Sequence, residues 1–175
     1  GERIDQLVLR EVMRSVEHGV PLDDIQVLSP MYRGAGGVDM LNRLMQATFN
    51  PAHSDRAEHR FGERLFRVGD KVLQIRNNYE KGVVNGDIGI LASINAQAKF
   101  VIVAFADQMC RYDFNELDQL VHAFAMSVHK SQGSEFRVVV LALLKAHYLL
   151  LQRNLLYSAI TRARDEARNL RQVIE

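Results

Sequence analysis

The sequence has few of the features that mark secreted, membrane-spanning or strongly charged proteins. Its 175 residues include one cysteine, Cys110, so an internal disulfide is excluded and a reducing compartment is expected. No apolar run is long enough to cross a bilayer, and the first three residues do not resemble a signal peptide. We therefore expect a cytoplasmic protein with no membrane partner.

An excess of charge of one sign is also missing. The 22 Lys and Arg residues nearly balance the 21 Asp and Glu residues, which leaves a formal net charge of +1. Any contact with nucleic acid must therefore come from locally placed basic side chains and backbone N–H groups. Hydrophobic residues make up 47% and charged residues 25%, as in an ordinary globular protein with one core and room for a small satellite domain.

A third absence concerns nucleotide chemistry. The phosphate-binding pattern G-x-x-x-x-G-K-[ST] does not occur, and no paired acidic motif for Mg²⁺ is evident. The backbone cradle and the lysine that hold ATP phosphates in P-loop enzymes are therefore missing. We expect that this chain alone does not hydrolyse ATP.

The first fifty residues alternate between helical and strand-like patterns, as layered α/β domains do. The expected elements are a helix over 3–18, a strand over 25–28, a glycine-rich loop over 31–37 and a helix from Val38 to about Asn50. Residues 53–64 are polar and mixed in charge, and we interpret them as a solvated connecting loop.

Between Phe66 and Leu117 the apolar period shifts towards two, which is typical of strands. The expected strands lie around 72–75, 88–94 and 100–105, and Asn85-Gly86-Asp87 is a strong turn signal. Several short strands in about fifty residues predict a small barrel or β-meander. The predicted organisation is therefore an α/β domain over 1–62 and 119–175 with a β module inserted at 63–118.

After the β module the α/β pattern returns. Two apolar runs, 121–128 and 138–144, predict buried strands joined by a polar, glycine-containing loop. Ligands of open α/β sheets collect where loops leave the strand ends, so this loop is a candidate site. A helix is expected near 150–164, whereas the charged tail 165–175 does not resemble a strand.

Three segments resemble conserved motifs of superfamily 1 helicases, in the right order. S-P-M-Y-R-G at 29–34 resembles motif IV, V-H-K-S-Q-G-S-E-F at 128–136 resembles motif V, and L-L-Y-S-A-I-T-R-A-R at 155–164 resembles motif VI. The spelling is most similar to RecD-like DNA helicases, relatives of the exodeoxyribonuclease V alpha chain. This resemblance implies a RecA-like (P-loop NTPase-type) domain with an inserted SH3-like β-barrel. It also implies the C-terminal part of an ATP-dependent 5′-3′ DNA helicase.

The resemblance assigns nucleotide contacts to two arginines and one loop. Arg162 and Arg33 match the arginines that contact phosphates, and Gln132, Gly133 and Glu135 match the part of motif V that faces the nucleotide. The implied cofactor is ATP with Mg²⁺, shared with an N-terminal RecA-like domain of the same protein. From the residues alone, a surface salt bridge for Arg162 and an ordinary turn for Arg33 stay open.

The resemblance also implies a track for single-stranded DNA. Ser127, His129 and Lys130 match the half of motif V that faces the strand, where hydroxyl, imidazole and ammonium groups suit phosphate oxygens. In the β module, Arg76 and Tyr79 could guide a strand by charge and stacking, although an exposed hairpin explains them equally well. His129 is not a metal-site candidate, because no second ligand follows it at helical spacing.

Two functions of another class remain open. The chain could be a non-enzymatic nucleic-acid-binding module that binds through its β module, or a scaffold subunit of a recombination and repair nuclease. The second alternative implies other exonuclease V-type subunits as partners.

Overall fold

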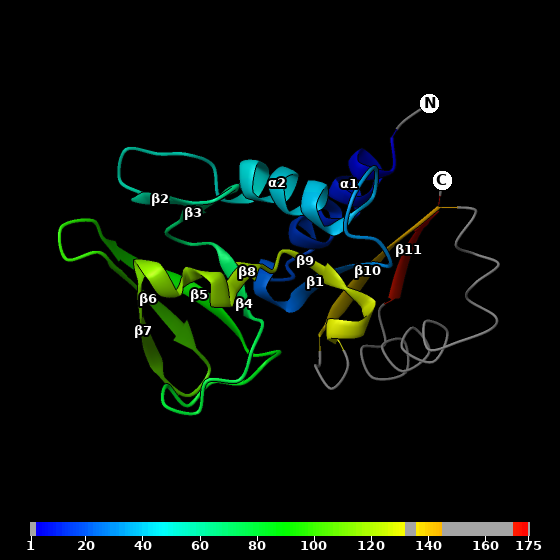
Figure 1. The fold of residues 1–175 in the computed structure, drawn as a ribbon. Coiled ribbons are helices and arrows are strands. Elements are labelled where there is room, and N and C mark those ends of the chain that lie inside the picture. Colours follow the sequence, from blue (N-terminus) through cyan, green and yellow to red (C-terminus); the bar gives the residue numbers. More distant parts are fainter. Residues whose placement is uncertain (1–2, 132–135, 145–169, 175) are drawn as a thin grey trace. The chain divides into compact units, whose positions relative to one another are not determined.

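The computed structural model describes residues 3–131, 136–144 and 170–174, the last of these by the backbone alone. The chain divides into two compact units (Figure 1). The α/β unit comprises Gly1–Met45 and Ala125–Glu175, and the β unit comprises Gln46–Phe124. No helix in the described ranges is long and apolar enough to span a membrane.

The described elements follow one another in the order shown in Figure 1. The α-helices are α1 (Ile4–Glu17) and α2 (Val38–Phe49), and the 3₁₀ helices are η1 (Leu22–Asp24), η2 (Phe114–Gln119) and η3 (Val128–Ser131). The strands are β1 (Ile25–Ser29), β2 (Glu58–Phe61), β3 (Arg64–Arg67), β4 (Lys71–Gln74), β5 (Ile88–Asn95), β6 (Phe100–Phe105), β7 (Met109–Asp113), β8 (Leu120–His122), β9 (Ala125–Ser127), β10 (Val138–Leu143) and β11 (Leu170–Ile174).

The α/β unit is built on a parallel sheet with the order β11-β10-β1-β9. All residues of β1, β9 and β10 are buried, as expected for parallel strands that are covered on both faces. The predicted strands at 25–28 and 138–144 are therefore confirmed. The near-continuous apolar sequence of β10 is explained by this burial.

Helix α1 confirms the helix predicted over 3–18. Ile4, Val8 and Val12 recur every four residues and are fully buried, and the helix lies against β10 and β11. Gly19 adopts a positive φ of 90° immediately after the helix, and its N–H donates to the carbonyl of Val16. A glycine in this conformation ends helices at little steric cost.

The charged tail contains a strand that the sequence did not predict. Strand β11 pairs in parallel with β10, with Val139 opposite Leu170 and Leu143 opposite Ile174. The tail alternates too little between polar and apolar residues for a strand to be predicted from it. Its structure depends on the neighbouring strand β10, which offers a free edge for pairing.

The β unit contains a five-stranded antiparallel sheet with the order β7-β6-β5-β4-β8. The predicted strands at 72–75, 88–94 and 100–105 are confirmed as β4, β5 and β6. Strands β4 to β7 pair one after another as an antiparallel meander, which is one of the two predicted arrangements. No closed barrel forms among the described residues, because β7 and β8 remain the two edges of an open sheet. A bulge between Leu91 and Ser93 shifts the pairing of β5 with β6, and such bulges bend a strand without closing the sheet.

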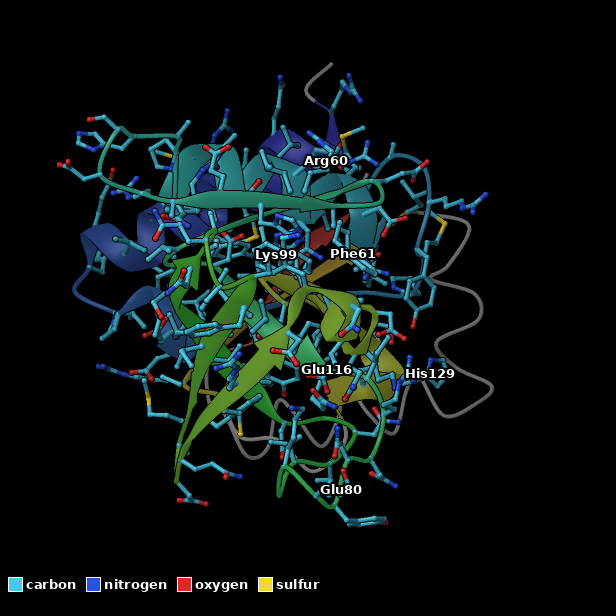
Figure 2. The ribbon with its side chains drawn as sticks, turned by 60° about the vertical axis from the view of Figure 1, so that its left-hand side comes forward. Arg60, Phe61, Glu80, Lys99, Glu116 and His129 are labelled. Carbon is cyan, nitrogen blue, oxygen red and sulfur yellow. The ribbon has the colours of Figure 1, made fainter. Side chains whose placement is uncertain are left out.

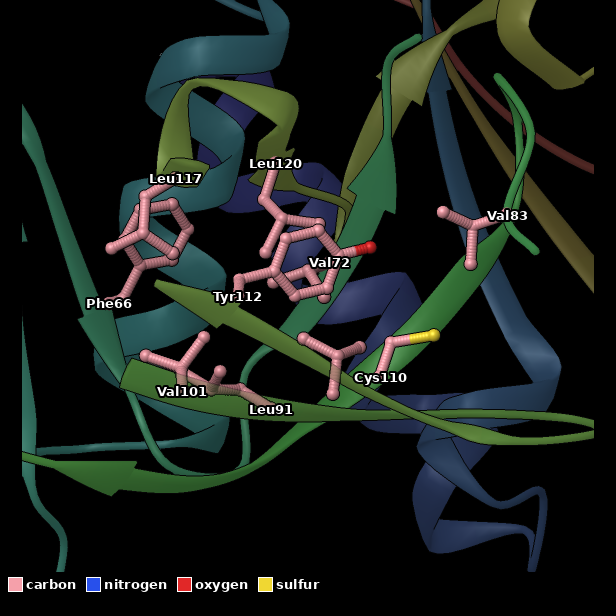
Figure 3. Close-up of a cluster of buried hydrophobic side chains, with 10 residues drawn as sticks. Phe66, Val72, Val83, Leu91, Val101, Cys110, Tyr112, Leu117 and Leu120 are labelled. Atoms are coloured by element: carbon pink, nitrogen blue, oxygen red, sulfur yellow. The ribbon is translucent and has the colours of Figure 1, made fainter. Parts of the chain in front are cut away.

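One hydrophobic cluster stabilises the β unit (Figure 3). It contains Phe66, Val72, Val83, Leu91, Val101, Val103, Cys110, Tyr112, Leu117 and Leu120. The Tyr112 hydroxyl donates to Oε1 of Gln74 over 2.7 Å, so the polar end of this buried ring is satisfied. Burial raises the pKa of the Tyr112 hydroxyl and of the Cys110 thiol, which keeps both groups neutral at physiological pH.

The segment interpreted as a loop, 53–64, instead enters a β-hairpin. Strands β2 and β3 pair as a two-stranded antiparallel ribbon, with Gly62 at a φ of +60° in the turn. The His59 ring stacks on Phe114 with 3.7 Å between the ring centroids. Because this contact is between residues far apart in the sequence, local polarity could not reveal it.

The apolar run 121–128 was expected to form one strand but contributes to both units. Residues up to His122 form β8, which pairs antiparallel with β4, whereas Ala125 begins β9, which pairs in parallel with β1. The predicted domain boundaries at 62/63 and 118/119 lie inside the β unit, which also includes β2 and β8. These boundaries stay a prediction.

Candidate functional site

Two motif-bearing segments leave the same edge of the parallel sheet. Strands β1 and β9 are neighbours, and their last residues, Ser29 and Ser127, lie opposite each other. The loop 30–37 follows β1, and η3 follows β9. Because parallel strands end at a common edge, the motif IV and motif V segments begin side by side.

The loop after β1 presents a side chain rather than its backbone. Arg33 is exposed on this loop. The N–H groups of the next turn are engaged internally: Gly36 with Asp5, Gly37 with Gly34, Val38 with Met31 and Asp39 with Tyr32. These four N–H groups are therefore not available to a ligand. An anion here would meet the Arg33 guanidinium.

The turn after β9 separates one buried residue from two accessible ones. Ser127 is 2% exposed, and its Oγ accepts a hydrogen bond of 3.3 Å from the N–H of Lys130. Ser131 Oγ donates to the carbonyl of Val128 over 2.6 Å. His129 is exposed at this turn (Figure 2), and Lys130 is half-buried. The hydroxyl of Ser127 thus caps η3, whereas His129 is accessible to a ligand.

Gln132, Gly133, Glu135 and Arg162 lie outside the described residues. Among the residues that are described, no group of three or more His, Cys, Asp or Glu side chains converges as a metal site would.

Residues 76–83 form the predicted polar hairpin in the β unit. Asn78 and Val83 pair across it, and the N–H of Lys81 donates to Oδ1 of Asn78. The Gln108 side chain donates to the carbonyl of Gly82 over 2.7 Å. Tyr79 is 79% exposed at the turn. The hairpin is thus held by its polar contacts while one aromatic ring faces solvent.

The two cations of this hairpin are already paired. Arg76 forms an ion pair with Asp118, and Lys81 Nζ lies 3.2 Å from a carboxylate oxygen of Glu116. Both acids belong to η2, and Glu80 adds a further negative charge on the hairpin itself (Figure 2). The hairpin therefore offers an aromatic surface rather than a positively charged one.

The sequence did not single out two buried carboxylates. Asp5 lies in the first turn of α1 and Asp70 follows the turn at Gly69, and both are at most 2% exposed. A buried carboxylate needs hydrogen-bond donors around it. The only sequence signal is an acid inside an otherwise apolar helix face or strand start, and such a signal does not identify the donors.

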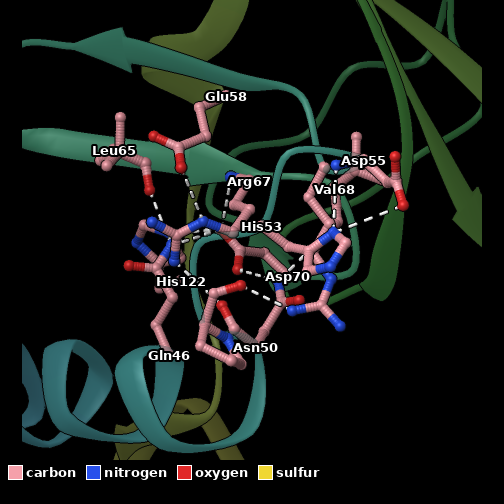
Figure 4. Close-up of polar contacts among 12 residues, drawn as sticks. Gln46, Asn50, His53, Asp55, Glu58, Leu65, Arg67, Val68, Asp70 and His122 are labelled. Carbon is pink, nitrogen blue, oxygen red and sulfur yellow. Dashed lines mark hydrogen bonds and ion pairs between the residues drawn. The ribbon is translucent and has the colours of Figure 1, made fainter.

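Asp70 is the centre of a buried polar network (Figure 4). Its Oδ1 accepts from Asn50 Nδ2 over 2.8 Å, and its Oδ2 accepts from Gln46 Nε2 and the N–H of Arg67, both over 2.8 Å. His122 Nε2 lies 2.9 Å from the same oxygen. These partners come from the end of α2, the residue that follows it, β3 and β8, so one side chain connects several segments of the β unit.

Two family models match the chain in sequence order. Residues 41–105 match the SH3 domain of ATP-dependent RecD-like DNA helicases, and residues 122–168 match the C-terminal domain of UvrD-like helicases. Both matched domains are therefore ones described in helicases.

Curated relatives with similar sequences include RecD-like helicases. The chain is 39% identical over 141 residues to the ATP-dependent RecD2 DNA helicase of Deinococcus radiodurans, an alignment that covers 81% of this chain and 19% of the relative. It is 31% identical over 147 residues to the RecBCD enzyme subunit RecD of Mycolicibacterium smegmatis, covering 84% of this chain and 25% of the relative. The resemblance to RecD-like DNA helicases is confirmed, and the chain is a homologue of them. It spans about a fifth to a quarter of the length of these two relatives.

Solved structures show the same fold. A Bacteroides Pif1 structure with bound single-stranded DNA matches with a TM-score of 0.55 and 13% identity, covering 94% of this chain and 48% of that chain. A structure of two coordinating Pif1 helicases on forked DNA also matches with a TM-score of 0.55, at 14% identity, covering 98% of this chain and 47% of that chain. At this identity the likeness describes the RecA-like helicase architecture and no residue roles.

Proposed function

We propose that this chain supplies motifs IV, V and VI to the ATP cleft of an ATP-dependent DNA helicase, together with part of its single-stranded DNA track. The adjacency of the motif IV loop and the motif V turn at one sheet edge supports this proposal most directly. The cleft would be completed by an N-terminal RecA-like domain, which would hold most of the ATP phosphates and the Mg²⁺.

The nucleotide side of the cleft depends on two arginines. The exposed guanidinium of Arg33 fits a phosphate oxygen, because a planar cation forms directed, charge-assisted hydrogen bonds. Arg162 is assigned by its motif to the phosphoryl group that is transferred, where a fixed positive charge offsets developing negative charge. Gln132, Gly133 and Glu135 complete the nucleotide side in this proposal, and ATP supplies the transferable phosphoryl group.

The DNA side is formed by the opposite part of the motif V turn. His129 and Lys130 are accessible enough to contact backbone phosphates, which position a strand without reading its sequence. Ser127 supports the same contact indirectly, because its hydroxyl caps the turn that carries His129 and Lys130. ATP binding would close the RecA-like domains and shift this turn along the strand, with 5′-3′ polarity inferred from the resemblance.

Replacing Arg33 by alanine is expected to lower DNA-stimulated ATP hydrolysis of the assembled helicase about 100-fold, because one charged donor to the phosphates is lost. Arg33→Lys should recover part of this loss, because the lysine ammonium restores the positive charge. The recovery should be incomplete, because lysine lacks the planar guanidinium that makes two directed hydrogen bonds. The measurement is a steady-state ATPase assay. Arg43→Ala is the matched control, because Arg43 is another exposed arginine of the same unit and lies on α2. Equal activity of the Arg33→Ala and Arg43→Ala enzymes would contradict the role of motif IV.

We propose a second DNA contact in the β unit, made by Tyr79 with Arg76 beside it. The β unit has nine Lys or Arg residues and ten Asp or Glu residues, a formal net charge of −1. Because Arg76 is paired with Asp118, the contact would depend on stacking of the exposed Tyr79 ring on a base. This charge balance disfavours a module that binds DNA mainly through phosphates.

Binding of a fluorescent oligothymidine by the 175-residue chain tests this contact through fluorescence anisotropy. Tyr79→Ala should weaken binding about 10-fold without changing its salt dependence, because base stacking contributes about 1–3 kcal/mol per base and releases no counterions. Tyr79→Phe keeps the ring and should bind as the unchanged chain does. If instead Arg76→Gln flattens the salt dependence and Tyr79→Ala binds normally, phosphates and not bases are the ligands of the hairpin.

The relatives that are RecBCD subunits suggest partners and a process. We propose that the complete protein acts in DNA repair or recombination and that other exonuclease V-type subunits are candidate partners. Co-purification of the tagged complete protein would identify such subunits.

A further inference from the structure

The loop that carries Arg33 is hydrogen-bonded to a buried carboxylate that has no assigned role. Asp5 is 2% exposed, and its Oδ1 accepts a hydrogen bond of 2.7 Å from the N–H of Gly36. Arg3 reaches the other carboxylate oxygen over 3.5 Å, but its side chain is 65% exposed, so this ion pair is weak. The well-formed contact of Asp5 is therefore the one to the loop, 31 residues away in sequence.

A second side chain holds the same glycine from the sheet. Ser29 Oγ donates to the carbonyl of Gly36 over 2.5 Å and accepts from the N–H of Met31 over 3.2 Å. Both polar groups of Gly36 are thus engaged, the N–H by α1 and the carbonyl by β1. Gly36 has a φ of +73°, and a Cβ at this position would lie 3.1 Å from Cγ2 of Ile4. Only glycine fits this conformation and this space without strain.

The contacts that fix Gly36 also constrain the backbone of Arg33. A Cβ on Gly37 would lie 2.8 Å from the backbone of Arg33, so the two ends of the turn are in close contact. The turn is closed by the bond from the Gly37 N–H to the Gly34 carbonyl. The backbone that carries Arg33 is therefore fixed by α1 and β1 before any ligand arrives. A charged side chain on a fixed backbone needs less reordering when it meets a phosphate.

We infer that Asp5 and Ser29 are positioning residues for Arg33, acting through Gly36 to set the loop conformation in which the guanidinium meets the nucleotide. This inference rests on the proposed function. It adds Asp5, which lies outside the three motif segments, and it gives Ser29, the first residue of the motif IV segment, a role that the resemblance does not assign. The relevant property of Asp5 is its acceptor oxygen rather than its charge, because its partner is a backbone N–H. Asparagine offers the same oxygen at the same place, whereas alanine does not.

The test is a double-mutant cycle on ATP hydrolysis by the assembled helicase. Asp5→Ala should lower kcat/KM for ATP about 10-fold or more, since a small displacement of a catalytic group is costly. Asp5→Asn should stay within about twofold of the unchanged enzyme, because the hydrogen bond to Gly36 is kept. Placed on Arg33→Ala, Asp5→Ala should add no further loss, since residues that act through one group are not additive.

If Asp5→Ala folds poorly, Ser29→Ala tests the same positioning role from the other side of Gly36. Thermal melting of each variant gives a temperature at which all variants are folded, and the assay is run at that temperature. Ser29→Ala should show the same loss, which again disappears on the Arg33→Ala background. A full additional loss on that background would mean that Asp5 only stabilises the unit, and no loss in either single variant would also overturn the inference. Both results differ from failure of the proposed function, in which Arg33→Ala itself leaves ATP hydrolysis unchanged.

Discussion

Replacing Arg162 by alanine is expected to lower ATP hydrolysis of the assembled helicase at least about 1,000-fold, the largest effect that we predict. The physical reason is that a fixed guanidinium offsets charge that develops on the phosphoryl group only in the transition state. Binding of single-stranded DNA, measured by anisotropy, should change little, since Arg162 is assigned to the nucleotide side. The Arg162→Ala variant should therefore lose ATPase activity while its affinity for single-stranded DNA stays nearly unchanged.

The matched control is Arg164→Ala, two residues further along the same motif. Arg164 has the same charge and lies in the same segment, but motif VI does not assign it to the transferred phosphoryl group. We expect the Arg164→Ala enzyme to keep most of its ATPase activity. Comparable losses in both variants would indicate a general effect on the motif, and retained activity in the Arg162→Ala enzyme would contradict the assignment.

Replacing Asp70 by alanine is expected to destabilise the β unit by about 3–5 kcal/mol, the second largest effect. The substitution leaves Gln46, Asn50, His122 and the N–H of Arg67 without their shared acceptor in a buried site. The network is also sterically closed, because a Cβ on Gly69 would lie 2.9 Å from Oδ1 of Asn50. Urea unfolding of the 175-residue chain, followed by circular dichroism, measures the change.

Asp55→Ala is the matched control for this experiment. Its carboxylate lies in the same unit, but its side chain is 89% exposed, so its loss should change the unfolding free energy by less than about 0.5 kcal/mol. Asp70→Asn should fall between the two, since it keeps one acceptor oxygen and introduces donors that face other donors. An Asp70→Ala chain as stable as the Asp55→Ala chain would show that Asp70 is not the centre of the network.

Much of the fold could be predicted because its elements are strongly periodic. The helix at α1 and the strands β1, β5, β6 and β10 have apolar residues at spacings that local geometry requires. The weakly periodic segments that form β2 and β11 were not predicted as strands. The ribbon of β2 and β3 depends on the stacking of His59 on Phe114, and β11 depends on pairing with β10.

The candidate site was predicted by motif rather than by geometry, and its residue roles stay a prediction. Motif spelling identified Arg33 and His129, and the structure has both of them exposed on loops that leave neighbouring strands. The spelling gave no indication that the hydroxyl of Ser127 caps η3 or that Arg76 is paired with Asp118. The Arg76–Asp118 pair joins residues 42 positions apart, which a short motif does not encode, whereas the Ser127 cap is a local bond that motif comparison did not consider.

The amino-acid sequence by itself determined the family resemblance and the type of the strongly periodic elements, because residue identity and spacing are local properties. Only the tertiary structure decided that the run 121–128 serves two sheets and that the five-stranded sheet stays open. It also decided that Asp5 and Ser29 hold the loop of Arg33. Most of these features involve residues that are far apart in sequence, such as Asp5 and Gly36, and such partners are selected only when the whole chain packs.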